Sequence, residues 1–430
     1  MNRMYPNAEK CLVSVTAKMV VCALLILAVP QVAISATLCV NPKGKGGCFT
    51  TITAAVTAAA VNDTIRVGKG TYAEDVTIGK SLSLISENQE NTIIDATALA
   101  NGVFIDGIDN PGLSNVVVSG FTVRNANFEG ILVANASSVT VSGNLVTGSD
   151  KALIVATPAC PGIPVFETNE SFDCGEGIHL LGANHSIVAN NLVEHNAGGI
   201  LISDDTARAD YNLITGNTVR KNPFDCGITL ASHSPAALTG SATPLGVTQN
   251  TISENFSTAN GLGAAGDGAG VGIFDGVVGG IASGNVVINN TLTNNGLPGV
   301  AMHSHAPGED LTNNVIVGNT ISGNHADTDD AATSGPTGIN VFGVSAASGT
   351  IISGNNISDE SLDVVVNTPT NADVNLNNLL GKGVGVQNLS TGTVNATQNF
   401  WGCAKGPGAK GCTTVSGTGI LATPFASEKF

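Results

Sequence analysis

The chain has 430 residues and is acidic, with a formal net charge of −16 at pH 7. Such a charge disfavours binding to nucleic acid or to anionic membranes. Aromatic residues make up only 4% and charged residues 12%, whereas glycine occurs 53 times. This composition is unusual for a globular enzyme of this length and suits a solenoid, whose thin core is filled by Ile, Val and Leu.

Residues 1–36 are typical of an export signal, because basic residues precede an apolar run over 19–34 and small residues follow. The run contains Pro30 and is short for a membrane span. We expect cleavage near Ala36, a secreted, periplasmic or cell-surface protein, and no membrane span in the mature chain. An uncleaved anchor is the alternative. Residues 37–430 keep 14 basic and 32 acidic side chains, so an anionic polysaccharide would need a bridging cation.

Seven cysteines remain in the expected mature chain. Two pairs with a spacing of nine residues, Cys39 with Cys48 and Cys403 with Cys412, are plausible disulfides in an exported protein. The other three are Cys160, Cys174 and Cys226, for which the pairs 160–174 and 174–226 are both possible. The odd cysteine is interpreted as a buried free thiol.

Residues 37–110 are predicted to form an N-terminal cap and the first turns of the solenoid. The alanine-rich segment 49–60 reads as a short amphipathic helix that covers the open end of a sheet. Segments 63–67, 68–72 and 76–78 follow as short strands linked by turns.

A repeat dominates residues 111–392. The motif Asn, any residue, aliphatic recurs with a shortest step of 23 residues, and longer steps contain insertions. Its asparagines are Asn144, Asn191, Asn217, Asn250, Asn290, Asn319, Asn355 and Asn378. A second motif, Gly, aliphatic, any residue, aliphatic, begins at Gly130, Gly177, Gly199, Gly227, Gly299 and Gly338. A third short strand precedes the Asn motif, as at 138–141, 185–188 and 314–317.

Each repeat is therefore one rung of three short strands, and stacked rungs complete a shared core. We predict an all-β fold, a single-stranded right-handed parallel β-helix with a short N-terminal capping helix. The repeated asparagines are expected to occupy turns, to tolerate left-handed backbone there and to hydrogen-bond from rung to rung. Residues 393–430, which contain Trp401, are expected to form a C-terminal cap.

The opening segment "FTTITAAV…NDTIRVGKGTYAEDVTIGKSLSLIS" and the Asn and Gly rungs resemble the pectin-lyase-like superfamily of right-handed parallel β-helix proteins, including its NosD-like exported members. The resemblance covers nearly all of residues 37–430. It implies the fold, and it leaves the activity open, because this superfamily contains polysaccharide lyases, hydrolases, epimerases and proteins without a known reaction.

Insertions at 234–246, 258–270, 304–312 and 326–337 mark the rungs on which a binding site is expected. With the residue after the motif glycine facing inward, positions four and six after it face outward. The outward side chains and neighbouring turns then supply a set of candidates on one face. The residues predicted to be catalytic are His233, His303, His305 and Asp205. Phe274 and Asp225 are predicted to bind substrate, and Asp329 and Asp330 are predicted to be metal ligands.

Histidine can transfer protons near neutral pH, and grouped carboxylates can hold Ca²⁺. Calcium would neutralise a uronate carboxylate, which favours removal of its C5 proton. The leading hypothesis is therefore a polysaccharide lyase or C5-epimerase on a uronic-acid polymer, with a hydrolase less favoured. The alternatives are a non-catalytic solenoid that binds glycan or protein, and a NosD-like role in metal handling, for which no copper-type Met or Cys cluster is present. A transition-metal site formed by His303 and His305 with Asp205 or His233 is a further alternative.

Overall fold

The computed structural model describes residues 35–150, 175–263 and 267–430. The predicted export signal therefore lies almost wholly outside the described residues, as do Cys160 and Cys174. The part from Ser35 to Phe430 forms one compact unit. Among the described residues, no helix is long and apolar enough to cross a bilayer.

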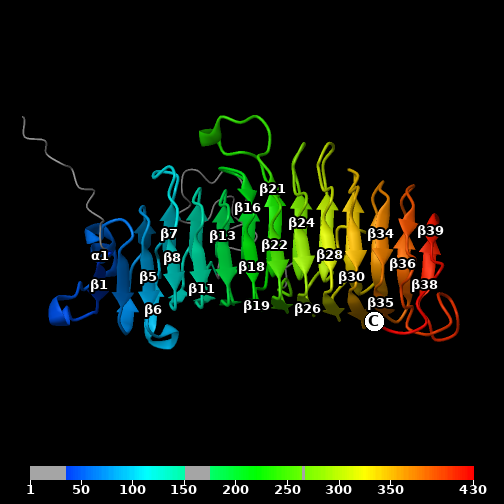
Figure 1. The fold of residues 1–430 in the computed structure, drawn as a ribbon, viewed down its shortest axis with the longest axis horizontal. Helices are drawn as coiled ribbons and strands as arrows, with labels where there is room; N and C mark the ends of the chain where they lie inside the picture. Colours follow the sequence, from blue (N-terminus) through cyan, green and yellow to red (C-terminus); the bar gives the residue numbers. More distant parts are fainter. Residues whose placement is uncertain (1–34, 151–174, 264–266) are drawn as a thin grey trace, which may run out of the picture. The chain divides into compact units, whose positions relative to one another are not determined.

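The described chain forms three long parallel sheets, here called A, B and C, each of which receives one strand from nearly every rung. In Figure 1 the rungs follow one another in sequence order from β1 to β39. The predicted parallel β-helix is confirmed. Sheet A contains β1 (Thr37–Val40), β2 (Thr64–Val67), β5 (Ser83–Ser86), β8 (Val117–Ser119), β11 (Thr140–Ser142), β14 (Ile187–Ala189), β18 (Leu213–Thr215), β22 (Thr251–Ser253), β25 (Val286–Ile288), β28 (Val315–Val317), β31 (Ile351–Ser353), β34 (Ala372–Asn375), β37 (Val394–Asn395) and β39 (Ile420–Leu421).

Sheet B contains β3 (Gly70–Tyr72), β6 (Thr92–Asp95), β9 (Thr122–Arg124), β12 (Leu145–Thr147), β15 (Leu192–Glu194), β19 (Thr218–Arg220), β23 (Phe256–Thr258), β26 (Thr291–Thr293), β29 (Thr320–Ser322), β32 (Asn356–Ser358) and β35 (Asn378–Leu380). Sheet C contains β4 (Val76–Ile78), β7 (Val103–Asp106), β10 (Ile131–Ala134), β13 (Glu176–Leu181), β16 (Gly198–Ser203), β20 (Ile228–Ser232), β24 (Val271–Asp275), β27 (Val300–Ser304), β30 (Thr337–Gly343), β33 (Leu362–Asn367), β36 (Val384–Asn388) and β38 (Thr414–Gly417).

The remaining elements lie in connections between rungs. Strands β17 (Ala209–Asp210) and β21 (Val247–Thr248) pair with each other. The short 3-10 helices are η1 (Lys45–Gly47), η2 (Gln89–Asn91) and η3 (Ala237–Thr239). The predicted insertion 234–246 contains η3 and forms the tall loop above β21 in Figure 1.

Stacked asparagines hold the turns of successive rungs in register. From Asn144 onward, one side-chain amide per rung donates to the side-chain oxygen of the next, along the series Asn144, Asn191, Asn217, Asn255, Asn290, Asn319, Asn355, Asn377 and Asn399. The same amides also donate to backbone carbonyls, as Asn290 does to Ile252. The predicted amide stacking is confirmed, and it satisfies polar groups that are buried between the sheets.

Two details of that prediction were wrong. Asn250 and Asn378 do not belong to this series: Asn250 bonds to Asn212 and Asn285 in a second ladder, and Asn377 takes the place given to Asn378. The left-handed backbone also lies one residue earlier, as at Gly216, Asn289 and Gly318. The ladder asparagine is needed for its amide, whereas the residue before it makes the turn.

A third ladder runs through Asn196, Asn222, Asn260, Asn295 and Asn324 and ends on the carboxylate of Glu360. Glu360 is completely buried. Burial raises the pKa of Glu360 from 4.5 to about 7, although hydrogen bonds from Asn324 oppose that rise. The last member of this ladder is therefore protonated below neutral pH.

The first rung is closed by the predicted helix, α1 (Ile52–Ala58). Thr51 caps it through its hydroxyl, and the Glu74 carboxylate accepts from the amides of Ile52 and Thr53. A carboxylate at a helix N-terminus is stabilising, because it satisfies unpaired amides. The buried face of the helix, which includes Val56, packs against the core.

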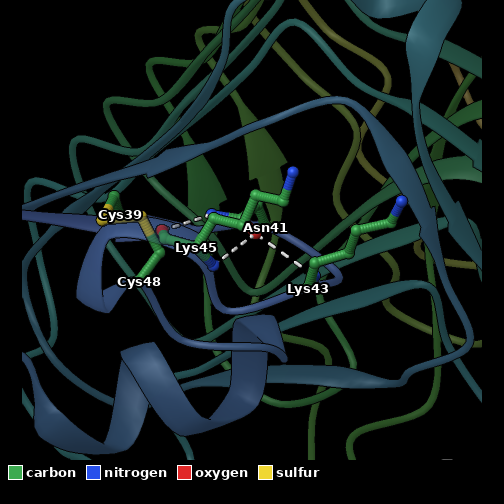
Figure 2. The surroundings of a disulfide bond; sticks show 5 residues. All are labelled: Cys39, Asn41, Lys43, Lys45 and Cys48. Carbon is green, nitrogen blue, oxygen red and sulfur yellow. Dashed lines mark hydrogen bonds between the residues drawn. A yellow bond between two sulfur atoms is a disulfide. The ribbon is translucent and has the colours of Figure 1, made fainter.

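Both predicted disulfides are present, Cys39–Cys48 near the first rung and Cys403–Cys412 near the last. Figure 2 shows the first of these beside a tight loop. There the side chain of Asn41 accepts from the amides of Lys43 and Lys45 and donates to the Lys45 carbonyl. The bridge and these hydrogen bonds together fix the loop that precedes α1.

At the other end, Trp401 is fully buried in the main core, close to Gly385. Cys226 is a buried free thiol, whereas Cys174, its possible partner in the sequence, lies outside the described residues. Burial raises the pKa of its thiol well above the usual range.

Replacing Asn290 by Ala should destabilise the protein by about 3 kcal/mol, because buried groups of Asn255, Ile252 and Asn319 each lose a hydrogen bond. Urea unfolding followed by circular dichroism measures this. The neighbouring Asn289→Gly is the matched control: Asn289 is exposed with a φ of 56°, so glycine there should cost less than about 0.5 kcal/mol. Equal midpoints for the two variants would contradict a stabilising ladder.

Glu360→Gln should remove part of the pH dependence of stability. The folded protein holds the Glu360 proton more tightly than the unfolded chain, so its stabilising contribution is full below pH 4.5 and is lost as pH rises through about 7. The glutamine variant lacks this loss, which is at most about 3 kcal/mol. Unfolding midpoints between pH 4.5 and 8 test this, and parallel profiles for both proteins would refute it.

Candidate functional site

The outer face of sheet C carries the candidate residues in the predicted register. Phe274, His303 and Phe342 are direct partners on β24, β27 and β30. Val300 and Met302 point into the main core, whereas Ala301 packs in a separate cluster on the outer side with Phe274. The alternation predicted from the Gly motif is therefore confirmed for this strand.

Facing outward does not mean being exposed. The connections before and after the sheet C strands fold over the sheet, so His303 is 0% and Asp205 1% exposed. The outward register of His303 and Asp205 therefore does not expose them, because connections between the rungs cover the outer surface of the sheet.

The first polar group surrounds His233, whose Nδ1 lies 3.2 Å from Oδ2 of Asp205. The His233 side chain is 14% exposed. Burial would raise the pKa of Asp205, but His233 and the Ser203 hydroxyl outweigh it and lower the pKa to about 2. Asp205 thus stays ionised and orients the imidazole of His233.

This group continues into a buried network that the sequence did not reveal. The Ser203 hydroxyl lies 2.8 Å from Nε2 of His179, and Nδ1 of His179 lies 3.3 Å from Glu129. The order of these side chains, serine, histidine and carboxylate, is that of a catalytic triad. Ser203 is fully buried, however, and offers no surface nucleophile. The sequence did contain a signal for this network. His179, two residues after Gly177, and Ser203, four residues after Gly199, are both in the outward register on adjacent rungs.

Asp204 anchors the loop 234–246 beside this group. Its carboxylate accepts from the amides of His233, Leu245 and Gly246 and from the Ser232 hydroxyl. Burial raises the pKa of Asp204, while these amides oppose the rise. The buried side chain of Asp204 therefore fixes the position of the 234–246 loop and of the His233 backbone.

The second polar group surrounds His303. Nε2 of His303 lies 2.6 Å from Oδ2 of Asp327, and Nδ1 lies 3.6 Å from Oδ2 of Asp329. Nε2 of His305 lies 3.5 Å from the same Asp329 oxygen. His303 is also enclosed by aromatic rings, with centroids 5.1 Å from Phe274 and 5.4 Å from His305.

Electrostatics in the second group favour a charged imidazole. Burial lowers the pKa of His303, but the carboxylates of Asp327 and Asp329 outweigh this and raise it to about 9. The imidazoles of His303 and His305 in turn hold the pKa of Asp329 well below its usual range. His303 is therefore an imidazolium at neutral pH when nothing else is bound.

The surface beside this group is acidic. Asp267 lies at the surface and accepts from the Thr328 hydroxyl, and partial desolvation together with the charges of Asp329 and Asp327 raises its pKa. Two arginines of the neighbouring rungs are engaged elsewhere. Arg220 pairs with Glu194 on sheet B, and Arg208 donates to the Leu245 carbonyl in the 234–246 loop. An anionic ligand here needs a cation other than these arginines.

The structure brings some predicted residues together and separates others. His303, His305, Asp329 and Phe274 form one group, while His233 and Asp205 form another about 10 Å away, two rung spacings along the stack. Asp225 instead accepts from the amide of its neighbour Cys226. Asp327 was not predicted as a partner.

Asp330 does not join the second group either. Its two oxygens accept from the side-chain amides of Asn340 and Asn367 and from the Ala332 amide. Calcium requires six to eight oxygen ligands. With Asp330 engaged and Asp329 facing two imidazoles, the predicted pair Asp329 and Asp330 does not fit calcium.

A shallow recess lies further along the stack, lined by Gly343, Asn367, Thr368 and residues 389–391. None of the described residues that line it is titratable. The chemistry-bearing side chains are therefore gathered at the two histidine groups rather than in this recess.

Comparison with known proteins agrees with this architecture. A family model described as a right handed beta helix region matches residues 101–276. Residues 101–276 are therefore similar to right-handed β-helix proteins, which supports the resemblance to the pectin-lyase-like superfamily. The NosD-like part of the resemblance is not confirmed. No curated protein matches the chain in sequence.

Several solved structures share the fold at low sequence identity. The Dettilon tailspike protein is 13% identical with a TM-score of 0.57, and the match covers 84% of this β-helix chain and 62% of the tailspike. A DFA-IIIase from Arthrobacter chlorophenolicus without its lid is 14% identical with a TM-score of 0.56, and the match covers 84% of this β-helix chain and 88% of the DFA-IIIase. The A-module of a mannuronan C-5 epimerase from Azotobacter vinelandii is 16% identical with a TM-score of 0.54, and the match covers 87% of this β-helix chain and 94% of the epimerase module. These identities establish a shared fold alone.

Asp204→Asn should loosen the 234–246 loop, because asparagine keeps one accepting oxygen where Asp204 uses two. Either the His233 amide or the amides of Leu245 and Gly246 then face a side-chain nitrogen that cannot accept. Cleavage by chymotrypsin near the exposed Leu238 should be about tenfold faster than in the wild type. Asp210→Asn on the nearby β17 is the control and should leave the rate unchanged. Unaltered cleavage of Asp204→Asn would contradict the anchoring role.

Proposed function

We propose that this β-helix protein is exported and acts on a polysaccharide across the outer face of sheet C, as a lyase or C5-epimerase of a uronic-acid polymer. The observation that carries the proposal is the pair His233 and Asp205, an imidazole held by a buried ionised carboxylate, one rung from the partly exposed ring of Phe274. Both reactions begin with removal of a proton from C5, for which such an imidazole is suited.

His233 would exchange that proton. Because Asp205 faces Nδ1, the exchange would pass through Nε2, and the ionised carboxylate would stabilise the imidazolium that forms. His303 has a different role in this proposal from the catalytic one predicted, since it is fully enclosed and cannot touch a polymer. It would act as a positioning residue for His305 and Asp329, which are 39% and 48% exposed.

Phe274 would hold a sugar ring. A side chain at Gly272 would collide with the Phe274 ring, so the ring lies over the glycine of its own strand. Aromatic rings are frequent in sugar-contacting surfaces because they offer a rigid apolar face. The fold shared with the mannuronan C-5 epimerase module supports this proposal at the level of architecture.

A non-catalytic glycan-binding protein is the second candidate. The observation that favours it is the enclosure of Asp205 and His303, which leaves mainly Phe274, His305 and Asp329 to meet a ligand. A neutral glycan would suit this role, because the acidic surface at Asp267 and Asp329 would not repel it.

An activity screen of the purified protein tests the proposal. Uronic-acid and neutral polysaccharides are incubated with the protein, with added Ca²⁺ or with a chelator. Unsaturated ends, reducing ends and exchange of the C5 proton are followed together. We expect activity on a uronic-acid polymer, a loss of at least about 10²-fold in kcat/KM for His233→Ala, and a raised KM for Phe274→Ala.

The matched control is His195→Ala, which removes an exposed imidazole at a turn beside sheet B. It should retain wild-type rates and the wild-type unfolding midpoint. Full activity of His233→Ala would exclude the assigned proton transfer. Binding without turnover on every polymer would move the assignment to the glycan-binding candidate.

A further inference from the structure

Three side-chain atoms of the second group converge at one point of the outer surface. Nδ1 of His303, Nε2 of His305 and one carboxylate oxygen of Asp329 all lie within 4.8 Å of one another. The Asp329 oxygen is 3.6 Å from the first nitrogen and 3.5 Å from the second. Ligand atoms around a tetrahedral ion with bonds near 2.1 Å are about 3.4 Å apart, so the two distances from the Asp329 oxygen are close to those in a metal site.

A buried nitrogen aimed into this point is the second, independent observation. His303 is completely enclosed, and its Nδ1 has no hydrogen-bond partner among the described residues. Its distance of 3.6 Å to Asp329 is too long for a hydrogen bond. A buried polar atom without a partner is costly, and a metal ion would satisfy it.

The opposite side of the His303 ring is fixed as in established metal sites. Nε2 faces Asp327 at 2.6 Å, and Asp327 accepts from the side-chain amide of Asn340 and the backbone amide of Asp329. A carboxylate on the second nitrogen orients a metal-binding imidazole and raises its basicity. The contact therefore presents Nδ1 toward His305 and Asp329.

We propose that His303, His305 and Asp329 bind one divalent transition-metal ion such as Zn²⁺. Two imidazole nitrogens and one carboxylate oxygen favour Zn²⁺, Ni²⁺ or Cu²⁺ over calcium, which prefers oxygen ligands. Three protein ligands leave a coordination position open, and the exposure of His305 and Asp329 directs it toward solvent.

This inference goes beyond the proposed function, since metal binding requires no polysaccharide. Only its link to the polymer rests on that function: the ion would supply the positive charge that a uronate carboxylate needs beside Asp267 and Asp329. The site lies about 10 Å from His233, so proton transfer there would remain separate from the ion.

Metal binding is measured on the full chain without a polyhistidine tag, after treatment with chelator and dialysis. Isothermal titration with Zn²⁺ and metal analysis of the dialysed protein should give one equivalent of Zn²⁺, and Ca²⁺ should give no binding at this site. Added Zn²⁺ should also raise the unfolding midpoint. Co²⁺ in place of Zn²⁺ should give the intense visible absorbance of a low-coordinate site with nitrogen ligands.

His305→Ala and Asp329→Asn alter exposed side chains and should keep the fold, but weaken Zn²⁺ binding by at least about 100-fold. Asp327→Asn should weaken it by about 10- to 100-fold and shift the Co²⁺ spectrum, as expected of a positioning residue. His195→Ala, at the turn beside sheet B, should bind as the wild type does.

Zn²⁺ affinity unchanged in His305→Ala would overturn the proposal, because the ion would then be held elsewhere. Absence of a stoichiometric ion in the wild-type protein would overturn it as well. One bound equivalent without turnover of any polysaccharide supports the metal site and counts against the proposed function. Turnover that is insensitive to chelator and to His305→Ala, without bound metal, supports the function alone.

Discussion

The structure depends on stacking identical turns directly above one another. A parallel ladder forms only where each rung offers its backbone amides to carbonyls of the next at the same spacing, and a shift at one turn would move every later rung. The buried asparagines prevent such a shift. Each binds the backbone of one rung and the amide oxygen of the next, so a long series such as Asn217, Asn255 and Asn290 acts as a continuous polar spine. Burial makes these bonds costly to leave unmade, which is why the turns tolerate insertions without losing register.

That regular frame makes the irregular segments useful. The connections at 234–246 and 326–336 contain no ladder asparagine, and they fold over the outer face of sheet C. They bring carboxylates from distant turns against histidines of the strands, as Asp327 and Asp329 are brought to His303. The same covering removes water from these charges. Their mutual effects on pKa are therefore large, and a residue such as Asp205 remains ionised although it is buried.

The two histidine groups differ in what they offer. His233 is held by one carboxylate, a proton-transfer arrangement. His303 and His305 share one carboxylate oxygen, an ion-binding arrangement. Phe274 lies between the two rungs that carry them. A polymer lying along the stack would meet an oriented imidazole, an aromatic ring and an acidic surface in succession, which unites the proposed reaction with the proposed ion.

The sequence by itself determined the fold, because the repeat is local. Three short alternating strands per rung, the Asn and Gly turns, the capping helix and the paired cysteines can all be derived from spacing. The outward register of Phe274 and His303 followed from alternation. Other features were decided only by tertiary structure. Burial of His303, capture of Asp330 by Asn340 and Asn367, and the arrival of Asp327 depend on how insertions fold back over a neighbouring rung. No periodicity encodes that path. Even the ladder shows this limit, since Asn250 and Asn255 carry equivalent local signals and only stacking assigns them to different turns.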